Sequence, residues 1–215
     1  MSNKIKQVVI LSGGKGTRMR EMTESLPKPM VPIGGIPVLE HLMNIFNRFD
    51  NFEFIFSTGY KSEIIEEYFK DKKNIRIVNT GEETSTGGRV FRLSEYLDEE
   101  FVVTYGDGLA NVNINKLISH HKKHGNLGTI TVANPISRFG LVEFDKEYSV
   151  NKFIEKPRLE NININIGFFV FKKEVINYLD KDCTLETTPL RKLSEESKLN
   201  AFVHKGYFEP MDTYR

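Results

Sequence analysis

The chain has 215 residues, of which 39% are hydrophobic and 27% are charged, and its formal net charge is +1. This length and composition suit one soluble globular domain, and the near-neutral charge excludes a global field that would draw the chain to nucleic acid or to a membrane surface. No stretch approaches the ~20 apolar residues of a membrane span. The single cysteine, Cys183, allows no internal disulfide, which fits a reducing compartment, so we expect a cytoplasmic protein.

The first half of the chain alternates short apolar runs with longer amphipathic ones. The apolar runs predict strands at 8–11, 52–57, 75–78, 101–104 and 129–133. The amphipathic runs predict helices at 38–49, 62–69, 88–96 and 114–124, with Ser62 as an N-cap. This alternation predicts a parallel sheet covered by helices on both faces.

The pattern changes after residue 138. Shorter and partly antiparallel strands are expected at 142–144, 153–154, 168–171 and 200–203, with helices near 175–179 and 190–196. Ligands of a doubly wound sheet bind outside the carboxyl ends of its strands. The loops after Leu11, Val78, Thr104 and Phe171 are therefore the expected ligand-binding loops.

A glycine-rich loop follows the first expected strand and reads Gly-Gly-Lys-Gly-Thr-Arg at residues 13–18. Three glycines let the backbone turn tightly and bring several N–H groups onto one anion, such as a polyphosphate. The loop is not a Walker loop, because no Gly-Lys-Ser/Thr follows at the required spacing, and Arg18 replaces the third glycine of a dinucleotide fingerprint. A plain glycine turn with solvated Lys15 and Arg18 is the alternative.

A second signal is Pro-Lys-Pro-Met at residues 27–30. The two prolines fix the backbone around Lys28 and disfavour a helix there. This arrangement suits a lysine that must point at a phosphate as a fixed charge.

Together, these two motifs resemble the signature of the sugar-phosphate nucleotidyltransferase family. Tyr-Gly-Asp-Gly at 105–108 is similar to the family's metal-binding segment, Glu-Lys-Pro at 155–157 to its acceptor-binding motif, and Pro-Met-Asp-Thr at 210–213 to the segment with its second metal aspartate. The resemblance implies an α/β, Rossmann-like fold, with a mixed, mainly parallel sheet flanked by helices and a small acceptor-side lobe.

The same resemblance implies one nucleotidyltransferase domain over 1–215. Its nucleotide-binding half is expected over roughly 1–135 and its acceptor-binding half over roughly 136–215. The family normally continues with a further helix, which leaves open a truncation after Arg215.

Within the family, the chain resembles the glucose-1-phosphate cytidylyltransferases, which implies CTP as the nucleotide. The similar segments are Thr-Gly at 80–81, Thr-Gly-Gly-Arg at 86–89, Arg-Phe-Gly at 138–140, Gly-Phe-Phe at 167–169 and the tail over 204–213. The glycine pair would let backbone groups reach the pyrimidine edge, and Arg89 would reach the cytosine carbonyl or N3. The alternative is that Gly87 and Gly88 only begin a helix and that Arg89 is solvated.

Two departures bear on the acceptor. This chain lacks a longer segment that the glucose-specific relatives carry between Tyr68 and Thr80, and Ile166 stands where they tend to have glycine. The branched side chain of Ile166 either takes up space beside the acceptor or turns into the core, because one register step decides its face. The acceptor is therefore expected to be a sugar 1-phosphate or a smaller phosphate such as L-glutamine phosphate, used for capsule or surface-polysaccharide precursors.

The resemblance implies a reaction in which the acceptor phosphate attacks the α-phosphorus of CTP in line and pyrophosphate leaves. Such chemistry needs positioning and charge neutralisation. Asp107 and Asp212 are expected to hold Mg²⁺, Arg18 to neutralise the leaving phosphates, and Lys28 to bridge the α-phosphate and the incoming phosphate.

The remaining expected site residues fall into two sets. Those for the nucleotide are Leu11, Gly13, Gly14, Gly16, Thr17, Thr80, Thr86, Gly87, Gly88, Arg89 and Gly106. Those for the acceptor are Gly140, Glu155, Lys156, Asn165 and Gly167, with Lys156 on the acceptor phosphate and Glu155 on a hydroxyl or amine.

Two other classes of protein are alternatives. The missing third glycine and the Pro-Lys-Pro motif argue against a nicotinamide oxidoreductase. The presence of Asp107, Asp212, Arg18 and Lys28 argues against a non-catalytic nucleotide-binding regulatory protein. The expected partners are CTP and a small phosphorylated acceptor, with no nucleic acid and no membrane, and a homo-oligomer is left open.

Overall fold

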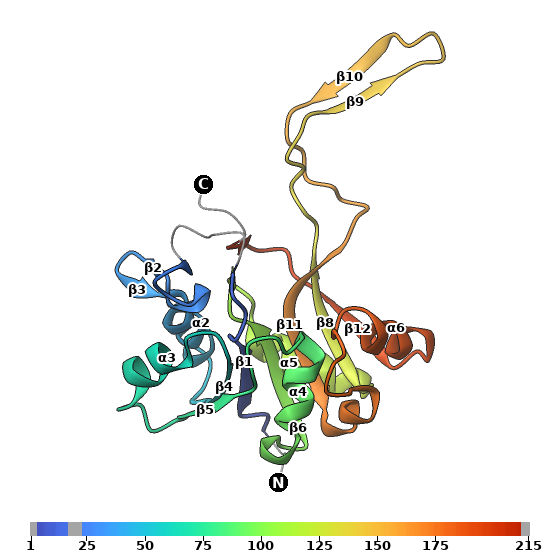
Figure 1. The fold of residues 1–215 in the computed structure, drawn as a ribbon. Coiled ribbons are helices and arrows are strands. Elements are labelled where there is room, and N and C mark those ends of the chain that lie inside the picture. Colours follow the sequence, from blue (N-terminus) through green and yellow to red (C-terminus); the bar gives the residue numbers. More distant parts are fainter. Residues whose placement is uncertain (1–3, 17–22, 212–215) are drawn as a thin grey trace.

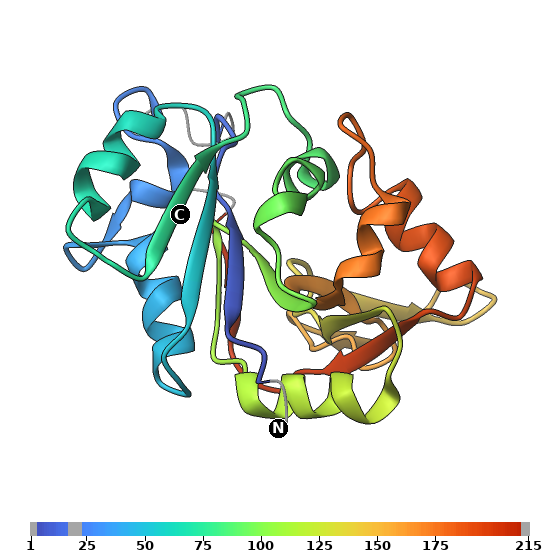
Figure 2. The same cartoon turned by 90° about the horizontal axis from the view of Figure 1, so that it is seen from below.

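Seven strands form a central sheet, and helices cover both of its faces (Figures 1 and 2). The computed structural model describes residues 4–16 and 23–211. The strand order is β12-β8-β11-β6-β1-β4-β5, and neighbouring strands are parallel except where β11 is one of the pair. The strands are β1 (Gln7–Leu11), β4 (Glu53–Thr58), β5 (Ile75–Asn79), β6 (Glu100–Tyr105), β8 (Gly128–Ala133), β11 (Ile164–Lys172) and β12 (Leu199–Val203). The predicted mixed, mainly parallel α/β sheet is confirmed.

Two hydrophobic cores lie on the two faces of this sheet. On β1, Val8 and Ile10 point into one core, and Val9 and Leu11 point into the other. The first core is covered by α2 (Val38–Asn47), α3 (Ser62–Phe69) and α5 (Ile114–His124). The second is covered by α4 (Thr86–Arg92), the 3₁₀ helix η4 (Lys173–Tyr178) and α6 (Thr188–Glu195). Burial on both faces explains why the central strands read as continuous apolar runs.

Several element ends differ from the sequence-based expectation. The N-cap of α3 is Lys61, in the left-handed region, and Ser62 is already helical, with its hydroxyl 2.8 Å from that of Thr58. Helix α4 begins two residues earlier than predicted and ends at Arg92, where the 3₁₀ helix η3 (Ser94–Tyr96) follows. The expected helix near 175–179 is the 3₁₀ helix η4. These differences are local and leave the topology unchanged.

The direction of β11 corrects one expectation about the ligand-binding edge. Because β11 runs antiparallel to β6 and β8, the loop after Phe171 lies at the opposite edge of the sheet. The start of β11, where Ile164 pairs with the last residue of β8, lies instead at the carboxyl edge of the parallel strands. This reversal brings residues 164–167 to the edge where a ligand would bind.

Three two-stranded ribbons and one short helix complete the fold. They are β2 (Pro32–Ile33) with β3 (Ile36–Pro37), β7 (Gly108–Ala110) with β13 (Phe208–Pro210), β9 (Leu141–Phe144) with β10 (Val150–Ile154), and the 3₁₀ helix η2 (Lys28–Met30). The β9–β10 ribbon and its stem, residues 136–158, form an arm that projects from the sheet edge at which β8 ends (Figure 1). No helix in the described ranges is long and apolar enough to cross a membrane.

Candidate active site

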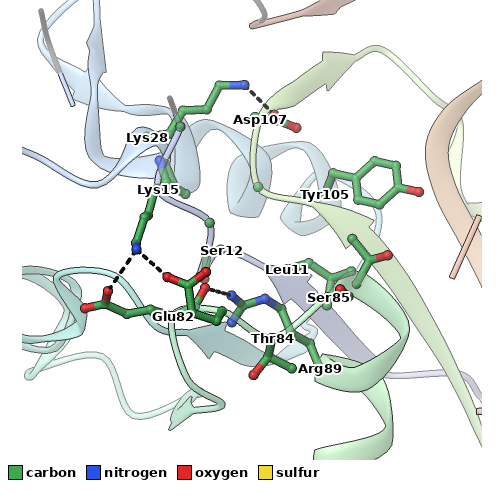
Figure 3. A pocket seen from close by; sticks show the side chains of 17 residues that line it. Leu11, Ser12, Lys15, Lys28, Glu82, Thr84, Ser85, Arg89, Tyr105 and Asp107 are labelled. Carbon is green, nitrogen blue, oxygen red and sulfur yellow. Dashed lines mark hydrogen bonds and ion pairs between the residues drawn. The ribbon is translucent and has the colours of Figure 1, made fainter. Parts of the chain in front are cut away.

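A cavity of about 560 Å³ opens at the carboxyl edge of the parallel strands (Figure 3). Its walls are the loops that follow β1, β5 and β6, together with η2 and the first residues of α4. The predicted site residues in these walls are Leu11, Gly13, Gly14, Gly16, Lys28, Thr86, Arg89, Gly106 and Asp107. Thr17, Arg18 and Asp212, which were also predicted, lie outside the described residues.

The glycine loop after β1 is held by backbone hydrogen bonds from both neighbouring strands. The Ser12 amide donates to the Ser57 carbonyl at 2.9 Å, and the Gly106 amide donates to the Leu11 carbonyl at 2.9 Å. Gly16 has φ +61°, which favours glycine. At Gly14, an added Cβ would meet nothing within 4 Å, so this glycine borders open space in the cavity wall.

Arg89 lies in the cavity wall against Gly13 and ties neighbouring strand ends together. Its Nη1 donates to the Thr58 carbonyl at 3.0 Å and to the Thr80 hydroxyl at 2.8 Å, and its Nη2 donates to the Glu82 carbonyl at 3.2 Å. The predicted nucleotide residue Thr80 is buried and serves here as a partner of Arg89. Burial lowers the pKa of Arg89, with a smaller contribution from Arg92, but a guanidinium stays protonated at neutral pH.

Lys28 and Asp107 meet across the cavity (Figure 3). The Lys28 Nζ lies 2.5 Å from a carboxylate oxygen of Asp107, and the side chain of Lys28 is only 11% exposed. Lys28 begins η2 directly after Pro27, and Asp107 follows the last residues of β6. Two motifs that are 79 residues apart in the chain thus form one charged pair at the sheet edge.

A second group of charged side chains also lines the cavity. Lys15, on the glycine loop, forms an ion pair with Glu83 and lies 3.6 Å from a carboxylate oxygen of Glu82. The hydrogen bond to Glu83 raises the pKa of Lys15 and lowers that of Glu83. Both Glu82 and Glu83 line the cavity.

A hydrogen-bond network joins the nucleotide side of the cavity to the start of β11. The Tyr105 hydroxyl donates to Glu186, whose other carboxylate oxygen accepts from the Thr86 hydroxyl at 2.6 Å. The Asn165 amide lies 3.5 Å from the Tyr105 hydroxyl. Burial and the Glu186 carboxylate raise the pKa of Tyr105, so its hydroxyl stays a neutral donor.

Residue 167 must be glycine because the Tyr105 ring lies against it. It has φ +78°, and an added Cβ would lie 2.2 Å from Cδ2 of Tyr105. Its amide is held by the Asn165 side chain at 2.8 Å. The two predicted acceptor residues at the start of β11 therefore position Tyr105, whose aromatic side chain lines the cavity.

The glycine pair at the start of α4 packs against the segment 181–185. An added Cβ at Gly87 would lie 2.4 Å from the Cys183 sulfur, and one at Gly88 would lie 2.4 Å from the Lys181 carbonyl oxygen. The Gly88 amide also donates to the Cys183 carbonyl at 2.9 Å. Close packing of this loop is one physical reason for the glycines, and contact with a pyrimidine stays a prediction.

Three predicted acceptor residues lie on the arm and not in the cavity wall. Gly140 contacts the ring of Phe153, and the exposed side chains of Glu155 and Lys156 lie 3.8 Å apart. Lys156 has φ +46°, a strained value for a residue with a side chain. Their role in acceptor binding stays a prediction.

Ile166 points into the interior. It is 2% exposed and belongs to the same hydrophobic core as Val8 and Phe168. The possibility that its side chain fills the acceptor space is therefore wrong, because the register of β11 turns it away from the cavity.

Among the residues that sequence reasoning did not predict are Tyr105, which lines the cavity, and its partner Glu186. Tyr105 stood inside the recognised Tyr-Gly-Asp-Gly segment and could have been included, since an aromatic side chain at a strand end adjoins any ligand there. Glu186 gave no signal, because its contact with Tyr105 joins residues 81 positions apart. Only the fold places them together.

The profile of a family described as "Nucleotidyl transferase" matches residues 7–207. The chain is 39% identical to glucose-1-phosphate cytidylyltransferase of Salmonella typhimurium, over 97% of this chain and 92% of that protein. It is equally identical, with the same coverage, to a probable glucose-1-phosphate cytidylyltransferase of Bacillus subtilis. The alignment with the Salmonella protein spans 237 positions, at least 22 more than the 215 residues of this chain, so that protein carries residues which this chain lacks.

Among solved structures, HddC from Yersinia pseudotuberculosis superimposes with a TM-score of 0.76 at 28% identity. The match covers 98% of this chain and 95% of that one. A second crystal structure of HddC, in complex with GMP-PN, matches with a TM-score of 0.74.

Proposed function

Because the chain belongs to the nucleotidyl transferase family, we propose that it is a cytidylyltransferase that transfers CMP from CTP to glucose 1-phosphate. The observation that carries the proposal is the cavity in which the glycine loop, Lys28 and Asp107 meet. The names of the relatives at 39% identity favour cytosine as the base and glucose 1-phosphate as the acceptor.

The chemistry is a displacement at the α-phosphorus of CTP. A phosphate oxygen of the acceptor forms the new P–O bond, the bond between the α-phosphorus and the bridging oxygen breaks, and pyrophosphate leaves. Lys28 is placed to neutralise negative charge at the reacting phosphates, since its ammonium is held inside the cavity wall. Amides of the glycine loop and Arg18 would bind the departing phosphates.

The carboxylate of Asp107 fits a divalent metal. It lines the cavity, is partly exposed, and is already paired with a cation, Lys28. Mg²⁺ binds through one or two carboxylates plus phosphate oxygens, and it would supply charge neutralisation at the α-phosphate. The Met211 amide donates to the Asp107 carbonyl at 2.8 Å, which supports the proposal that Asp212, the next residue, is the second ligand.

The acceptor is proposed to enter beside Tyr105, Asn165 and Gly167. Tyr105 lines the cavity two residues before Asp107, and Asn165 and Gly167 lie next to it at the start of β11. The burial of Ile166 removes the objection that a branched side chain blocks a hexose there. The division into a nucleotide half over 1–135 and an acceptor half over 136–215 belongs to the same proposal.

We also propose a homo-oligomer held by the arm. Among the described residues, nine of the sixteen large exposed hydrophobic side chains lie between Ile136 and Ile154. All nine residues of β9 and β10 are exposed, so neither face of this ribbon packs on its own chain. An isolated two-stranded ribbon is marginal in water, so a second copy that covers it would stabilise it.

An acceptor panel tests the proposed function. Pyrophosphate release with CTP is measured against glucose 1-phosphate, other hexose 1-phosphates and phosphorylated glutamine. Glucose 1-phosphate is expected to give the highest kcat/KM, at about 10⁴ M⁻¹s⁻¹ or above. A higher value with phosphorylated glutamine would move the assignment to a non-sugar acceptor.

A further inference from the structure

Arg89 is a cation buried without a carboxylate partner. The residue is 4% exposed, and no carboxylate in residues 4–16 and 23–211 lies within ion-pair distance of its guanidinium. Its hydrogen bonds go to the Thr58 and Glu82 carbonyls and to the Thr80 hydroxyl. Such partners satisfy N–H groups but leave the net charge uncompensated, which is costly inside a protein.

The fold places this charge directly against the glycine loop, in the cavity wall. An added Cβ at Gly13 would lie 1.9 Å from Nη1 and 2.3 Å from the Cζ of Arg89, so the guanidinium contacts the inner face of Gly13. Figure 3 shows the side chain of Arg89 below the loop, on the same side as Glu82 and Thr84. Arg89 itself lines the cavity, beside Gly13 and together with Glu82 and Thr84.

The acidic side chains of the cavity wall are engaged elsewhere. Glu82 and Glu83 lie on the segment whose backbone Arg89 holds, but their carboxylates face Lys15. Arg92, on the next turn of α4, adds positive charge near Arg89. The charge of Arg89 is therefore available to an anion bound in the cavity beside Gly13.

We infer that Arg89 is a positioning residue for the polyphosphate of the bound nucleotide, acting from the cavity wall through the glycine loop beside it and through its charge. It holds the ends of β4 and β5 against that loop and places positive charge next to it. A buried charge acts at longer range than an exposed one, because the surrounding protein screens it less than water does. The inference rests on the proposed nucleotidyl transfer. It assigns Arg89 to the phosphates of the nucleotide, in place of the direct contact with cytosine that the sequence predicted.

A series of ligands with increasing numbers of phosphates separates this role from two others. A charge beside the loop favours CTP over CDP, CMP and cytidine in proportion to ligand charge. A direct contact with the base would contribute equally to all four ligands. A purely structural role would change the stability of the protein without any dependence on phosphate number.

The experiment is calorimetric titration of cytidine, CMP, CDP and CTP into the wild type, Arg89→Met and Arg89→Lys. Arg92→Met is the matched control, because Arg92 is an exposed arginine on the same helix. We expect Arg89→Met to weaken the binding of CTP at least tenfold and that of cytidine less than twofold. The losses for CMP and CDP should lie between these two. Arg89→Lys, which keeps the charge, is expected to stay within about threefold of the wild type for every ligand.

Two results would overturn the inference while leaving the proposed function intact. One is an equal loss for all four ligands in Arg89→Met, and the other is a loss of cytidine affinity in Arg89→Lys. If Arg89→Met does not fold, Arg89→Gln supplies the neutral side chain, since its amide can still donate to the Thr58 carbonyl. A wild type that binds none of the four ligands would contradict the proposed function itself.

Discussion

Lys28 is held almost completely inside the cavity wall, with its ammonium 2.5 Å from the Asp107 carboxylate. The flanking prolines restrict the backbone, and residues 28–30 form a short 3₁₀ helix whose three residues are all buried. The charge of this lysine is therefore positioned before any substrate binds. Such preorganised charge is the usual source of transition-state stabilisation in phosphoryl chemistry.

Replacement of Lys28 by methionine tests this role. Lys28→Met keeps the length of the side chain, so we expect a folded protein whose turnover falls about a hundredfold, equivalent to about 2.7 kcal/mol. Steady-state pyrophosphate release measures the turnover, and circular dichroism checks that the variant is folded. Lys116→Met, an exposed lysine on α5, is the control. A folded Lys28→Met with more than about a tenth of the wild-type rate would count against a role at the reacting phosphates.

Gly13 and Gly14 are adjacent, but they have different reasons to be glycine. A side chain at Gly13 would collide with Arg89, whereas one at Gly14 meets nothing in the ligand-free protein. We expect Gly14→Ala to leave the melting temperature within about 2 °C of the wild type while weakening CTP binding, because the new methyl group enters the space of the phosphates. Gly13→Ala should lower the melting temperature. Thermal unfolding measures the melting temperature of both variants, and calorimetric titration measures their affinity for CTP. An unchanged CTP affinity in Gly14→Ala would mean that the phosphates bind elsewhere.

At the scale of elements, α5 carries a histidine whose burial makes stability depend on pH. His121 is fully buried, with Nδ1 2.9 Å from the Thr129 hydroxyl and Nε2 3.5 Å from a carboxylate oxygen of Glu100. Burial lowers the pKa of His121 to about 4, with smaller contributions from Lys172, Lys122 and His120. The unfolded chain binds this proton more readily than the native protein does, so stability is lost as the pH falls from about 6.5 towards 4.

The expected loss from His121 is about 2 kcal/mol in the free energy of unfolding between pH 7.5 and pH 5. His121→Asn, which can keep the hydrogen bond to Thr129, should remove most of this pH dependence. Urea unfolding of both proteins at the two pH values measures it. If His121→Asn loses as much stability as the wild type, then the acid sensitivity resides in other groups.

Local patterns predicted most of the strands and helices of the first half, because each of these elements is a buried apolar run or an amphipathic run of its own. They failed where the structure depends on a distant partner. The direction of β11 follows from its pairing with β6 and β8, and the inward turn of Ile166 follows from the same pairing. The 3₁₀ form of η4 likewise has no signal in residues 173–178 alone.

The residues of the candidate site were likewise predictable where a local pattern places them and not predictable where a distant partner does. Residues that follow parallel strands, such as Gly13, Gly106 and Asp107, were predictable because the ends of such strands meet at one edge. The network of Tyr105 and Glu186 was not, because it joins segments that no local rule relates. The position of Glu155 and Lys156 on the arm was also not predictable, because only the fold shows that this segment leaves the sheet.

At the scale of the whole molecule, the arm carries large apolar side chains that a single copy of the chain leaves exposed to solvent. The two sides of its stem are joined to each other, since the Ser137 amide donates to the Pro157 carbonyl and the Leu159 amide donates to the Pro135 carbonyl, both at 2.9 Å. The arm exposes Phe139, Phe144, Val150 and Phe153 to solvent. An exposed apolar projection of this kind is typical of an interface between copies of a chain.

Polar substitution of the arm tests the interface. We expect the wild type to be an oligomer in analytical ultracentrifugation, and a Phe139→Ser and Val150→Ser double variant to shift towards the monomer. Tyr207→Ser, a comparably exposed residue outside the arm, should not shift the mass. A monomeric wild type at micromolar concentration would rule out this assembly.

The central claim is that the cavity between the glycine loop and Asp107 transfers CMP to a phosphorylated acceptor. Its most direct test is to quantify, in one reaction with CTP, glucose 1-phosphate and Mg²⁺, both the pyrophosphate released and the CMP-linked sugar formed. The account predicts equal amounts of the two products from the wild type, and at least a hundredfold slower formation of both by a folded Asp107→Asn variant. Pyrophosphate without the linked sugar, or an Asp107→Asn variant that retains the wild-type rate, would contradict it.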